Sequence, residues 1–293
     1  MSVIPTPVPT CKWTLLTAGN ANVVYKSDET DQLLRLRRQR NAPSTAEVDE
    51  YLTGTIRPAI GSFLFDYTVV NLPVGFLESL PEAEDLDLGE PLGLLMENLG
   101  PKPQETNVLK SHAVKINYSD DWKSYTVELK PKWLLRSPTE PKDSLNCRTC
   151  ALQLKRGKPR ICPLRLFNSD EKTSLQALEE VFPGTEKQLE PLAKFFSNSE
   201  LFAEIRHMQN GDELGILGYS NYVQVPPQFV TAMTMRDVSL FVHVEGEQVT
   251  GKIVDADLKS ASDKRDYWAS LETDLIEGGW YEKTGTNCLL SNN

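Results

Sequence analysis

The sequence predicts an α+β fold built from two lobes. Short alternating strands fill the first part of the chain, strands and helices mix in the second part, and the Pro-rich stretch 100–103 separates them. This order of elements is typical of α+β proteins whose active site lies between lobes. We therefore expect an N-terminal lobe at residues 1–100, a C-terminal lobe at residues 101–293 and a hinge at 100–103.

Turn signals and hydrophobic periodicity place the elements of the N-terminal lobe. Ser44 and Glu47 have the spacing of a capping box, which predicts a helix that ends near residue 56. Apolar runs connected by small and polar residues predict strands at 13–17, 23–25, 33–37 and 92–96.

The C-terminal lobe is predicted to mix both kinds of element. Helical spacing predicts helices at 171–181, 186–197, 201–207 and 262–277. Strand-type runs predict strands at 125–129, 236–244 and 249–254. Residues 136–168 show no clear period, so we expect an irregular segment there.

Composition and charge exclude several classes of protein. The 293 residues are 40% hydrophobic and 25% charged, which is ordinary for a folded globular chain. No apolar run approaches the ~20 residues that cross a bilayer, and the first residues do not resemble a signal peptide, so we expect an intracellular protein without membrane contact. A net charge of −10 argues against a nucleic-acid partner, which requires a broad basic surface. A local basic pocket for a small polyanion remains compatible with it.

The five cysteines do not form a disulfide framework. Cys147, Cys150 and Cys162 are clustered, whereas Cys11 and Cys288 stand alone, which fits a reducing compartment. The cluster offers three thiolates with no histidine nearby, while structural zinc requires four ligands. Zinc is therefore not expected as a cofactor.

A loop of small residues lies between the first two predicted strands. Small side chains let backbone N–H groups approach phosphates closely, but a plain hairpin explains the same pattern. The loop and its flanks contain Gly19, Asn20, Ala21, Asn22 and Val23. On a following strand, Arg35 and Arg37 share one face, where a cation could hold the phosphates of a nucleotide.

Acidic residues stand at the ends of two strand-type runs near the carboxyl end. Asp237 begins the first run, and Asp255 ends the second, four residues before Lys259. One carboxylate could receive a proton from an attacking hydroxyl while the other holds Mg²⁺ against ATP phosphates. The pattern indicates a nucleotide-dependent phosphotransferase, although a β-hairpin with acidic turn residues also fits it.

Two lysines flank a proline at the end of another predicted strand. Glu128 and Lys130 project from one side of this strand, and Lys132 follows Pro131. The lysines would repel each other unless an anion lay between them. A surface edge protected against aggregation is the alternative.

Together these motifs resemble the inositol-pentakisphosphate 2-kinase family. Residues 128–132 are similar to its E-x-K-P-K signature, 235–240 to its R/K-D-C-S motif and 255–259 to its D-L-D-L-K motif. Weaker matches at 19–24, 34–37, 147–150 and 162–167 follow in family order, so the resemblance covers nearly the whole chain. The short length is more similar to fungal members than to plant ones.

The resemblance implies a fold distantly similar to protein kinases. It also implies transfer of the ATP γ-phosphate to the 2-hydroxyl of inositol 1,3,4,5,6-pentakisphosphate, and the product is inositol hexakisphosphate. It makes Asp237 the general base, with Lys130 beside it in the catalytic set, and makes Asp255 and Asp237 the Mg²⁺ ligands. ATP contacts are implied for the loop 19–23 and for Arg35, Glu97, Asn98, Leu99, Glu128 and Asp255. Substrate contacts are implied for Lys130, Lys132, Asn198, Arg206, Lys259, Lys264 and Tyr267.

The sequence departs from the family pattern in places. Ala256 and Ser260 replace the usual Leu and Pro, and Asp263 stands where a basic contact is frequent, so Lys264 or Arg265 is expected to substitute. We expect a monomer that uses ATP and Mg²⁺; nuclear rather than cytoplasmic residence is implied by the resemblance alone. The rival hypothesis is an inactive kinase-like module that binds inositol phosphates or a protein partner.

Overall fold

The computed structural model describes residues 5–38, 43–158, 161–219, 224–284 and 287–292, and the chain divides into two compact units. Unit 1 is Met1–Leu99 and unit 2 is Gly100–Asn293. Each unit contains a β-sheet with helices, so the predicted α+β class is confirmed. No helix in the described ranges is long and apolar enough to cross a membrane.

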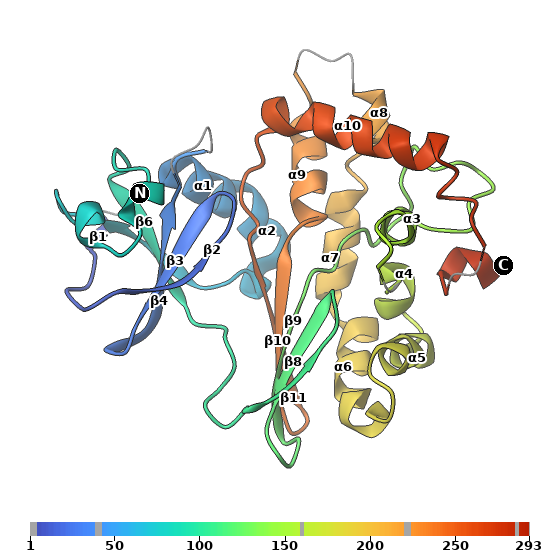
Figure 1. The fold of residues 1–293 in the computed structure, drawn as a ribbon, viewed down its shortest axis with the longest axis horizontal. Helices are drawn as coiled ribbons and strands as arrows, with labels where there is room; N and C mark the ends of the chain where they lie inside the picture. The colour runs from blue at the N-terminus through green and yellow to red at the C-terminus, as the bar shows by residue number, and fades with distance from the viewer. Residues whose placement is uncertain (1–4, 39–42, 159–160, 220–223, 285–286, 293) are drawn as a thin grey trace. The chain divides into compact units, whose positions relative to one another are not determined.

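Unit 1 contains a six-stranded sheet in the order β1-β5-β6-β4-β3-β2 (Figure 1). Its neighbouring strands pair antiparallel except for β1 and β5, which pair parallel. The strands are β1 Thr6–Pro7, β2 Thr14–Ala18, β3 Asn22–Ser27, β4 Thr30–Arg37, β5 Tyr67–Asn71 and β6 Leu92–Glu97. The predicted strands of this unit are confirmed, but β1 and β5 were not predicted.

The helical part of unit 1 begins at the predicted capping box. The Ser44 side chain accepts from the Glu47 N–H at 3.3 Å, and the Glu47 carboxylate accepts from the Ser44 N–H at 2.8 Å. These bonds satisfy two groups that a helix start leaves open. The helix runs as α1 Thr45–Tyr51, a π-helical stretch Leu52–Ile56 and α2 Arg57–Ile60. Short 3₁₀ turns follow at Gly61–Phe63, Leu77–Ser79 and Ala83–Asp85.

Unit 2 contains a five-stranded antiparallel sheet in the order β11-β10-β9-β8-β7. Its strands are β7 Asn107–Lys110, β8 Val114–Tyr118, β9 Ser124–Leu129, β10 Ser239–Glu245 and β11 Gln248–Val254. Helix α6 packs on β10 and β11, where Phe195 lies against Gly251. This contact fixes the sheet against the helical layer.

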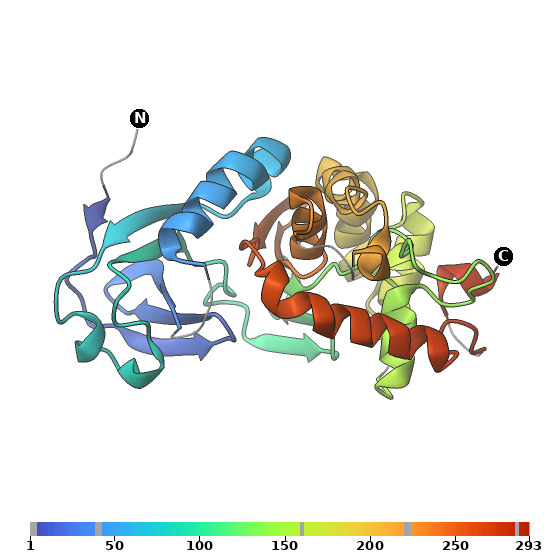
Figure 2. The same ribbon diagram turned by 90° about the horizontal axis from the view of Figure 1, so that it is seen from above.

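The helices of unit 2 cover one side of the sheet. The long α10 runs across the ends of α9 and α3 (Figure 1). Figure 2 shows α10 from above, along most of its length. The helices are α3 Arg148–Lys155, α4 Pro163–Leu166, α5 Glu171–Val181, α6 Glu186–Asn198, α7 Glu200–Gln209, α8 Gly215–Gly218, α9 Pro227–Met235 and α10 Ala261–Glu277. A final 3₁₀ turn spans Leu289–Asn292.

Two predictions for unit 2 were wrong. The segment 136–168, expected to be irregular, contains α3 and α4, whose short length leaves too few turns for a hydrophobic period to show. The strand expected from residue 236 begins at Ser239, because Arg236 is the C-cap of α9 and Asp237 lies between the helix and β10. Strands β7 and β8 and helices α8 and α9 were not predicted.

The contact between Gly251 and Phe195 allows a stability test. A Cβ atom at Gly251 would lie 2.5 Å from the Phe195 ring, whereas one at Gly54 meets nothing within 4 Å. Gly251→Ala should lower the free energy of unfolding by about 1–3 kcal/mol, the usual cost of overpacking. Gly54→Ala is the control and should be neutral or slightly stabilising. Urea denaturation measures both; equal stabilities would contradict the tight packing of α6 on β11.

Candidate functional site

In unit 2, three ammonium groups surround one carboxylate. The Oδ1 atom of Asp237 lies 3.1 Å from Lys132 Nζ and 3.6 Å from Lys130 Nζ, and its Oδ2 atom lies 3.2 Å from Lys259 Nζ. Lys130 Nζ also donates to the Asp237 backbone carbonyl at 3.1 Å. The four side chains carry a formal charge of +2, so the cluster suits a ligand with several negative groups.

Strand pairing explains why these residues meet. The register pairs Leu240 of β10 with Leu129 of β9 and Ser239 of β10 with Val254 of β11. The end of β9, the start of β10 and the end of β11 therefore lie at one edge of the antiparallel sheet (Figure 1). The segments that leave this edge carry the lysines and Asp237, which are far apart in the sequence.

The cations control the ionisation of Asp237, whose side chain is 47% exposed. Burial by itself raises the pKa of this carboxyl, but the three surrounding ammonium groups outweigh burial and hold the pKa well below its usual value. Burial lowers the pKa of the Lys132 ammonium group, and the Asp237 carboxylate acts in the opposite direction. Asp237 is therefore ionised at neutral pH and is a weak base while the lysines contact it.

Lys132 and Asp255 both have a left-handed backbone, with φ of 62° and 59°. This conformation is unfavourable for lysine and easier for aspartate. Such residues persist when surrounding contacts hold them, and they gather at functional sites. At Lys132 this conformation coincides with the turn that brings Nζ to Asp237.

Asp255 lies beside the lysine cluster and is suited to hold a hard cation. It follows β11 directly, its side chain is exposed, and Ser239 Oγ donates to its Oδ2 atom at 3.0 Å. An oriented and accessible carboxylate is the ligand that Mg²⁺ prefers. Asp237 lies two residues before Ser239, and Asp255 follows Val254, which pairs with Ser239 on the neighbouring strand. Both proposed metal ligands therefore come from the same sheet edge.

Gln209 on α7 was not among the predicted site residues, and its buried side chain supports the backbone next to the cluster. Its side chain is 1% exposed; Nε2 donates to the carbonyls of Lys132 at 2.8 Å and Met235 at 3.1 Å, and Oε1 accepts from the Leu134 N–H at 2.8 Å. One amide thus connects the lysine segment to the segment before Asp237. A single glutamine in a helix carries no sequence signal for this role.

Trp133, the residue after Lys132, lies between two arginines. The guanidinium carbons of Arg236 and Arg148 are 3.6 Å and 4.5 Å from its ring centroid. Arg236 is 4% exposed and pairs with Asp212 at 2.5 Å, while Arg148 pairs with Glu272 of α10 at 2.6 Å. The Arg148–Glu272 pair joins α3 to α10, and the Arg236–Asp212 pair joins the residue before Asp237 to the segment after α7.

Helix α10 presents two of the predicted substrate contacts on its first turns. Lys264 is exposed and Tyr267 is 59% exposed, and their three-residue spacing puts them on one face. Lys259 precedes this helix and already contacts Asp237. The structure therefore brings Lys259 into the cluster, and the roles of Lys264 and Tyr267 stay predictions.

Three other predicted residues lie elsewhere in unit 2. Asn198 is exposed at the end of α6, and half-buried Arg206 on α7 donates to the Phe167 carbonyl. Glu128 is exposed on β9, two residues before Lys130. In the part of the chain that the structure describes, none of the three forms a hydrogen bond or ion pair with Asp237, so their ligand contacts stay predictions.

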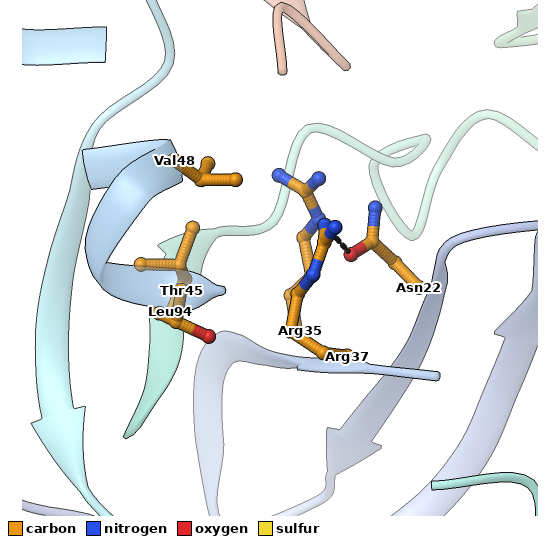
Figure 3. Close-up of a pocket in the computed structure, with 6 residues that line it drawn as sticks. All are labelled: Asn22, Arg35, Arg37, Thr45, Val48 and Leu94. Atoms are coloured by element: carbon orange, nitrogen blue, oxygen red, sulfur yellow. Dashed lines mark hydrogen bonds between the residues drawn. The ribbon is translucent and has the colours of Figure 1, made fainter. Parts of the chain in front are cut away.

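Unit 1 has a pocket of its own, in which two arginines point from β4 into one space (Figure 3). Arg35 and Arg37 are 5% and 7% exposed, and Arg37 Nη1 donates to Asn22 Oδ1 at 2.7 Å. The space is small, and its two guanidinium groups suit a single phosphate group better than a whole nucleotide. The lining residues are Asn22, Arg35, Arg37, Thr45, Val48 and Leu94.

The small-residue loop between β2 and β3 is a hairpin turn. The Gly19 N–H donates to the Asn22 carbonyl at 2.8 Å, and Arg38 Nη1 donates to the Gly19 carbonyl at 2.7 Å. The Gly19 amide is therefore already bonded within the turn. A phosphate contact by the tip residues Asn20 and Ala21 stays a prediction.

The remaining predicted nucleotide contacts also lie in unit 1. Val23 is buried in β3. At the end of β6, Glu97 Oε1 accepts from the Asp66 N–H at 2.7 Å, followed by exposed Asn98 and buried Leu99. The Glu97 bond fixes the strand end where the chain leaves unit 1.

Comparison with known proteins identifies the family of the whole chain. A family model described as inositol-pentakisphosphate 2-kinase matches residues 16–274. The inositol-pentakisphosphate 2-kinase of Yarrowia lipolytica is 88% identical over 292 residues, the whole length of both chains. The enzymes of the same name from Eremothecium gossypii and Candida glabrata are 27% and 24% identical; each alignment covers 89% of this chain, and 96% and 93% of those proteins. The chain belongs to the inositol-pentakisphosphate 2-kinase family.

Proposed function

We propose that this protein transfers the γ-phosphate of ATP to the 2-hydroxyl of inositol pentakisphosphate and so forms inositol hexakisphosphate. The observation that carries the proposal is the convergence of three lysines on Asp237, beside the accessible carboxylate of Asp255, in a chain of this family. The lysines supply positive charge for a polyanion, and the two carboxylates supply a proton acceptor and a metal ligand.

Substrate binding changes the environment of Asp237. Phosphates of the substrate compete with the Asp237 carboxylate for the three ammonium groups, because their negative charge is larger and more accessible. When a lysine turns towards a phosphate, the pKa of Asp237 rises towards its usual value and a carboxylate oxygen becomes available to the substrate hydroxyl. The lysines thus occupy the carboxylate oxygens until the substrate arrives.

Asp237 then orients the 2-hydroxyl and accepts its proton. Phosphoryl transfer passes through a loose transition state. Little negative charge has developed on the attacking oxygen at that point, so a weak carboxylate base is sufficient. Positioning of the hydroxyl and neutralisation of phosphate charge by the lysines supply most of the acceleration.

Asp255, with Asp237, is the proposed holder of Mg²⁺. The metal neutralises charge on the transferring phosphates when it is bound. The exposed carboxylate of Asp255 fits this ion because Ser239 orients one oxygen and hard oxygen ligands suit Mg²⁺. The Asp237 carboxylate remains ionised at neutral pH, because the surrounding ammonium groups hold its pKa low, and metal binding requires an ionised carboxylate.

In unit 1, Arg35 and Arg37 are the proposed contacts for ATP phosphates, and the Glu97–Leu99 segment is the proposed neighbour of adenine. The pair of buried guanidinium groups in one pocket supports the first assignment, since each can bind two phosphate oxygens. Family membership supports the second assignment. We also propose a monomer located in the nucleus or cytoplasm.

Direct assay separates this function from an inactive binding module. The protein is incubated with ATP, Mg²⁺ and inositol pentakisphosphate, the products are resolved by anion exchange, and the phosphorylated position is assigned by NMR. Formation of the hexakisphosphate with loss of ATP supports the kinase. Binding of the pentakisphosphate without any turnover would favour the inactive module, for which a metal-holding carboxylate has no use.

Asp237→Asn tests the proton acceptor. The amide keeps the shape but cannot accept the proton, so turnover should fall at least ~100-fold, the usual size of a general-base effect. Inositol pentakisphosphate should still bind, because the lysines are retained. Rapid-quench assays and calorimetry measure the two quantities, with the exposed Asp121→Asn as the control. Near-normal turnover would remove Asp237 from the mechanism.

Lys132→Met tests the substrate side of the cluster. Loss of one ammonium group should raise KM for inositol pentakisphosphate more than KM for ATP, and should weaken the salt dependence of substrate binding. Lys123→Met, which changes an 82% exposed lysine in the same unit, is the matched control. A larger effect on KM for ATP would assign Lys132 to the nucleotide instead.

Asp255→Ala tests the metal ligand. Turnover should be abolished and Mg²⁺ should no longer strengthen ATP binding, whereas binding of the inositol phosphate without metal should be unchanged or tighter, because a negative charge is lost. Asp274→Ala, a surface carboxylate of unit 2, is the control. Calorimetric titration with and without Mg²⁺ decides the matter: an unaltered Mg²⁺ effect on ATP binding contradicts this role.

A further inference from the structure

One side-chain amide on α7 contacts both chain segments that carry the lysine cluster. Gln209 Nε2 donates to the carbonyl of Lys132 at 2.8 Å and to the carbonyl of Met235 at 3.1 Å. Its Oε1 atom accepts from the Leu134 N–H at 2.8 Å. The nitrogen and the oxygen of the amide are therefore both used, and all three partners are backbone groups within two residues of a cluster side chain.

The first of these segments is the turn that carries Lys132. This residue has a left-handed backbone with φ of 62°, a conformation that is unfavourable for lysine and persists where surrounding contacts hold it. The Gln209 amide contacts both ends of the turn, at the carbonyl of Lys132 and the N–H of Leu134. The place of Lys132 Nζ, which lies 3.1 Å from Asp237 Oδ1, therefore depends on these two bonds.

The second segment is the end of α9, which leads to Asp237. Met235 is the last residue of α9, and its carbonyl accepts from Gln209 two residues before Asp237. The backbone of Gln209 adds another bond, because its carbonyl accepts from Arg236 Nη2 at 3.3 Å. The residue that directly precedes the proposed base is thus also held to α7.

The support for this amide is rigid. Gln209 is the last residue of α7 and is 1% exposed, and α7 packs against α9. A lysine side chain has many rotamers, so a fixed backbone limits the positions that its ammonium group can reach.

We propose that Gln209 is a positioning residue of the reaction and acts through two other side chains. Through the Lys132 carbonyl it places an ammonium group for a substrate phosphate, and through the Met235 carbonyl it places the carboxylate of Asp237. The inference rests on the proposed function and assigns two separate effects to one amide. Loss of the first bond weakens binding of inositol pentakisphosphate, and loss of the second misplaces the proton acceptor. The ATP contacts proposed in unit 1 are not affected by either.

Gln209→Met removes the three side-chain hydrogen bonds and keeps an unbranched side chain of similar length. We expect kcat to fall about 10- to 100-fold, because a misplacement of about 1 Å can cost 10²-fold, and KM for inositol pentakisphosphate to rise more than KM for ATP. Steady-state kinetics with each substrate varied in turn measures these quantities. Equal rises in the two KM values, or normal kinetics, would overturn the proposal.

Gln153→Met on α3 is the matched control. The Gln153 amide is half-buried and also binds backbone, because it donates to the Ile161 carbonyl at 3.3 Å and accepts from the Ile161 N–H at 2.9 Å. This variant should lose stability in urea denaturation while kcat and both KM values stay at the wild-type level. The same kinetic losses in Gln153→Met would mean that any lost amide has this effect, and would contradict a special role of Gln209.

A double-mutant cycle tests whether Gln209 acts through Lys132. In a Lys132→Met background, Gln209→Met should no longer raise KM for inositol pentakisphosphate, because the group that it places is gone. Its effect on kcat should remain, because the bond to Met235 does not involve the lysine. A rise in KM by the same factor in both backgrounds would show a purely structural role and overturn the proposal.

Gln209→Asn covers the case in which Gln209→Met does not fold. It keeps the amide, but its side chain is one methylene shorter and cannot reach all three backbone partners, so the same selective rise in KM is expected. Calorimetric binding of inositol pentakisphosphate separates this inference from the proposed function. Binding without turnover in the wild type would refute the kinase function alone, whereas wild-type affinity in Gln209→Asn together with normal kcat would refute the positioning role.

Discussion

The attraction between Asp237 and three lysines is the interaction on which the site depends. Lys130, Lys132 and Lys259 leave the same sheet edge, and their ammonium groups would repel one another without the carboxylate between them. Asp237 therefore serves the free protein as a counter-ion, in addition to its proposed role as the base of the reaction. A site for a polyanion has this problem in general, because the charge that binds the ligand destabilises the protein when the ligand is absent.

Buried polar groups hold this arrangement in place. Gln209 joins the backbone on both sides of the lysine cluster, and the Arg236–Asp212 pair is almost completely shielded from water. Such a pair contributes little net stability, because desolvation offsets much of the attraction, but it costs several kcal/mol to break from one side. Its value here is geometric: Arg236 immediately precedes Asp237, and its stacking on Trp133 holds the chain next to Lys132.

The two units contribute different kinds of charge. In unit 1, Arg35 and Arg37 are buried in a pocket beside α1, where planar guanidinium groups can each grip two oxygens. In unit 2 the cations are lysines on chain segments next to the sheet edge, with compact charges that can turn from a carboxylate to a phosphate. The proposed function assigns the buried arginines to the nucleotide and the lysines, which can turn, to the phosphorylated sugar.

Local chemistry in the sequence determined much of the fold. The capping box of Ser44 and Glu47, the alternation in 33–37 and the helical spacing in 171–181 act between near neighbours, and each predicted its element correctly. The lysine and aspartate motifs were recognisable because three short segments retain family residues in family order. The helices in 136–168 were missed because their sequences are short and their stability comes from packing.

Only the tertiary structure decided which distant residues meet. Strand register brings Lys130, Asp237 and Lys259 to one edge, and no local pattern specifies the pairing of β9 with β10. The same is true of Gln209, whose amide reaches a segment 77 positions away, and of Cys288, which joins three cysteines from the other end of the unit. Residue type and local spacing therefore determined which functional groups the chain carries. Long-range pairing determined where these groups come together, because contacts between distant segments depend on the packing of the whole unit.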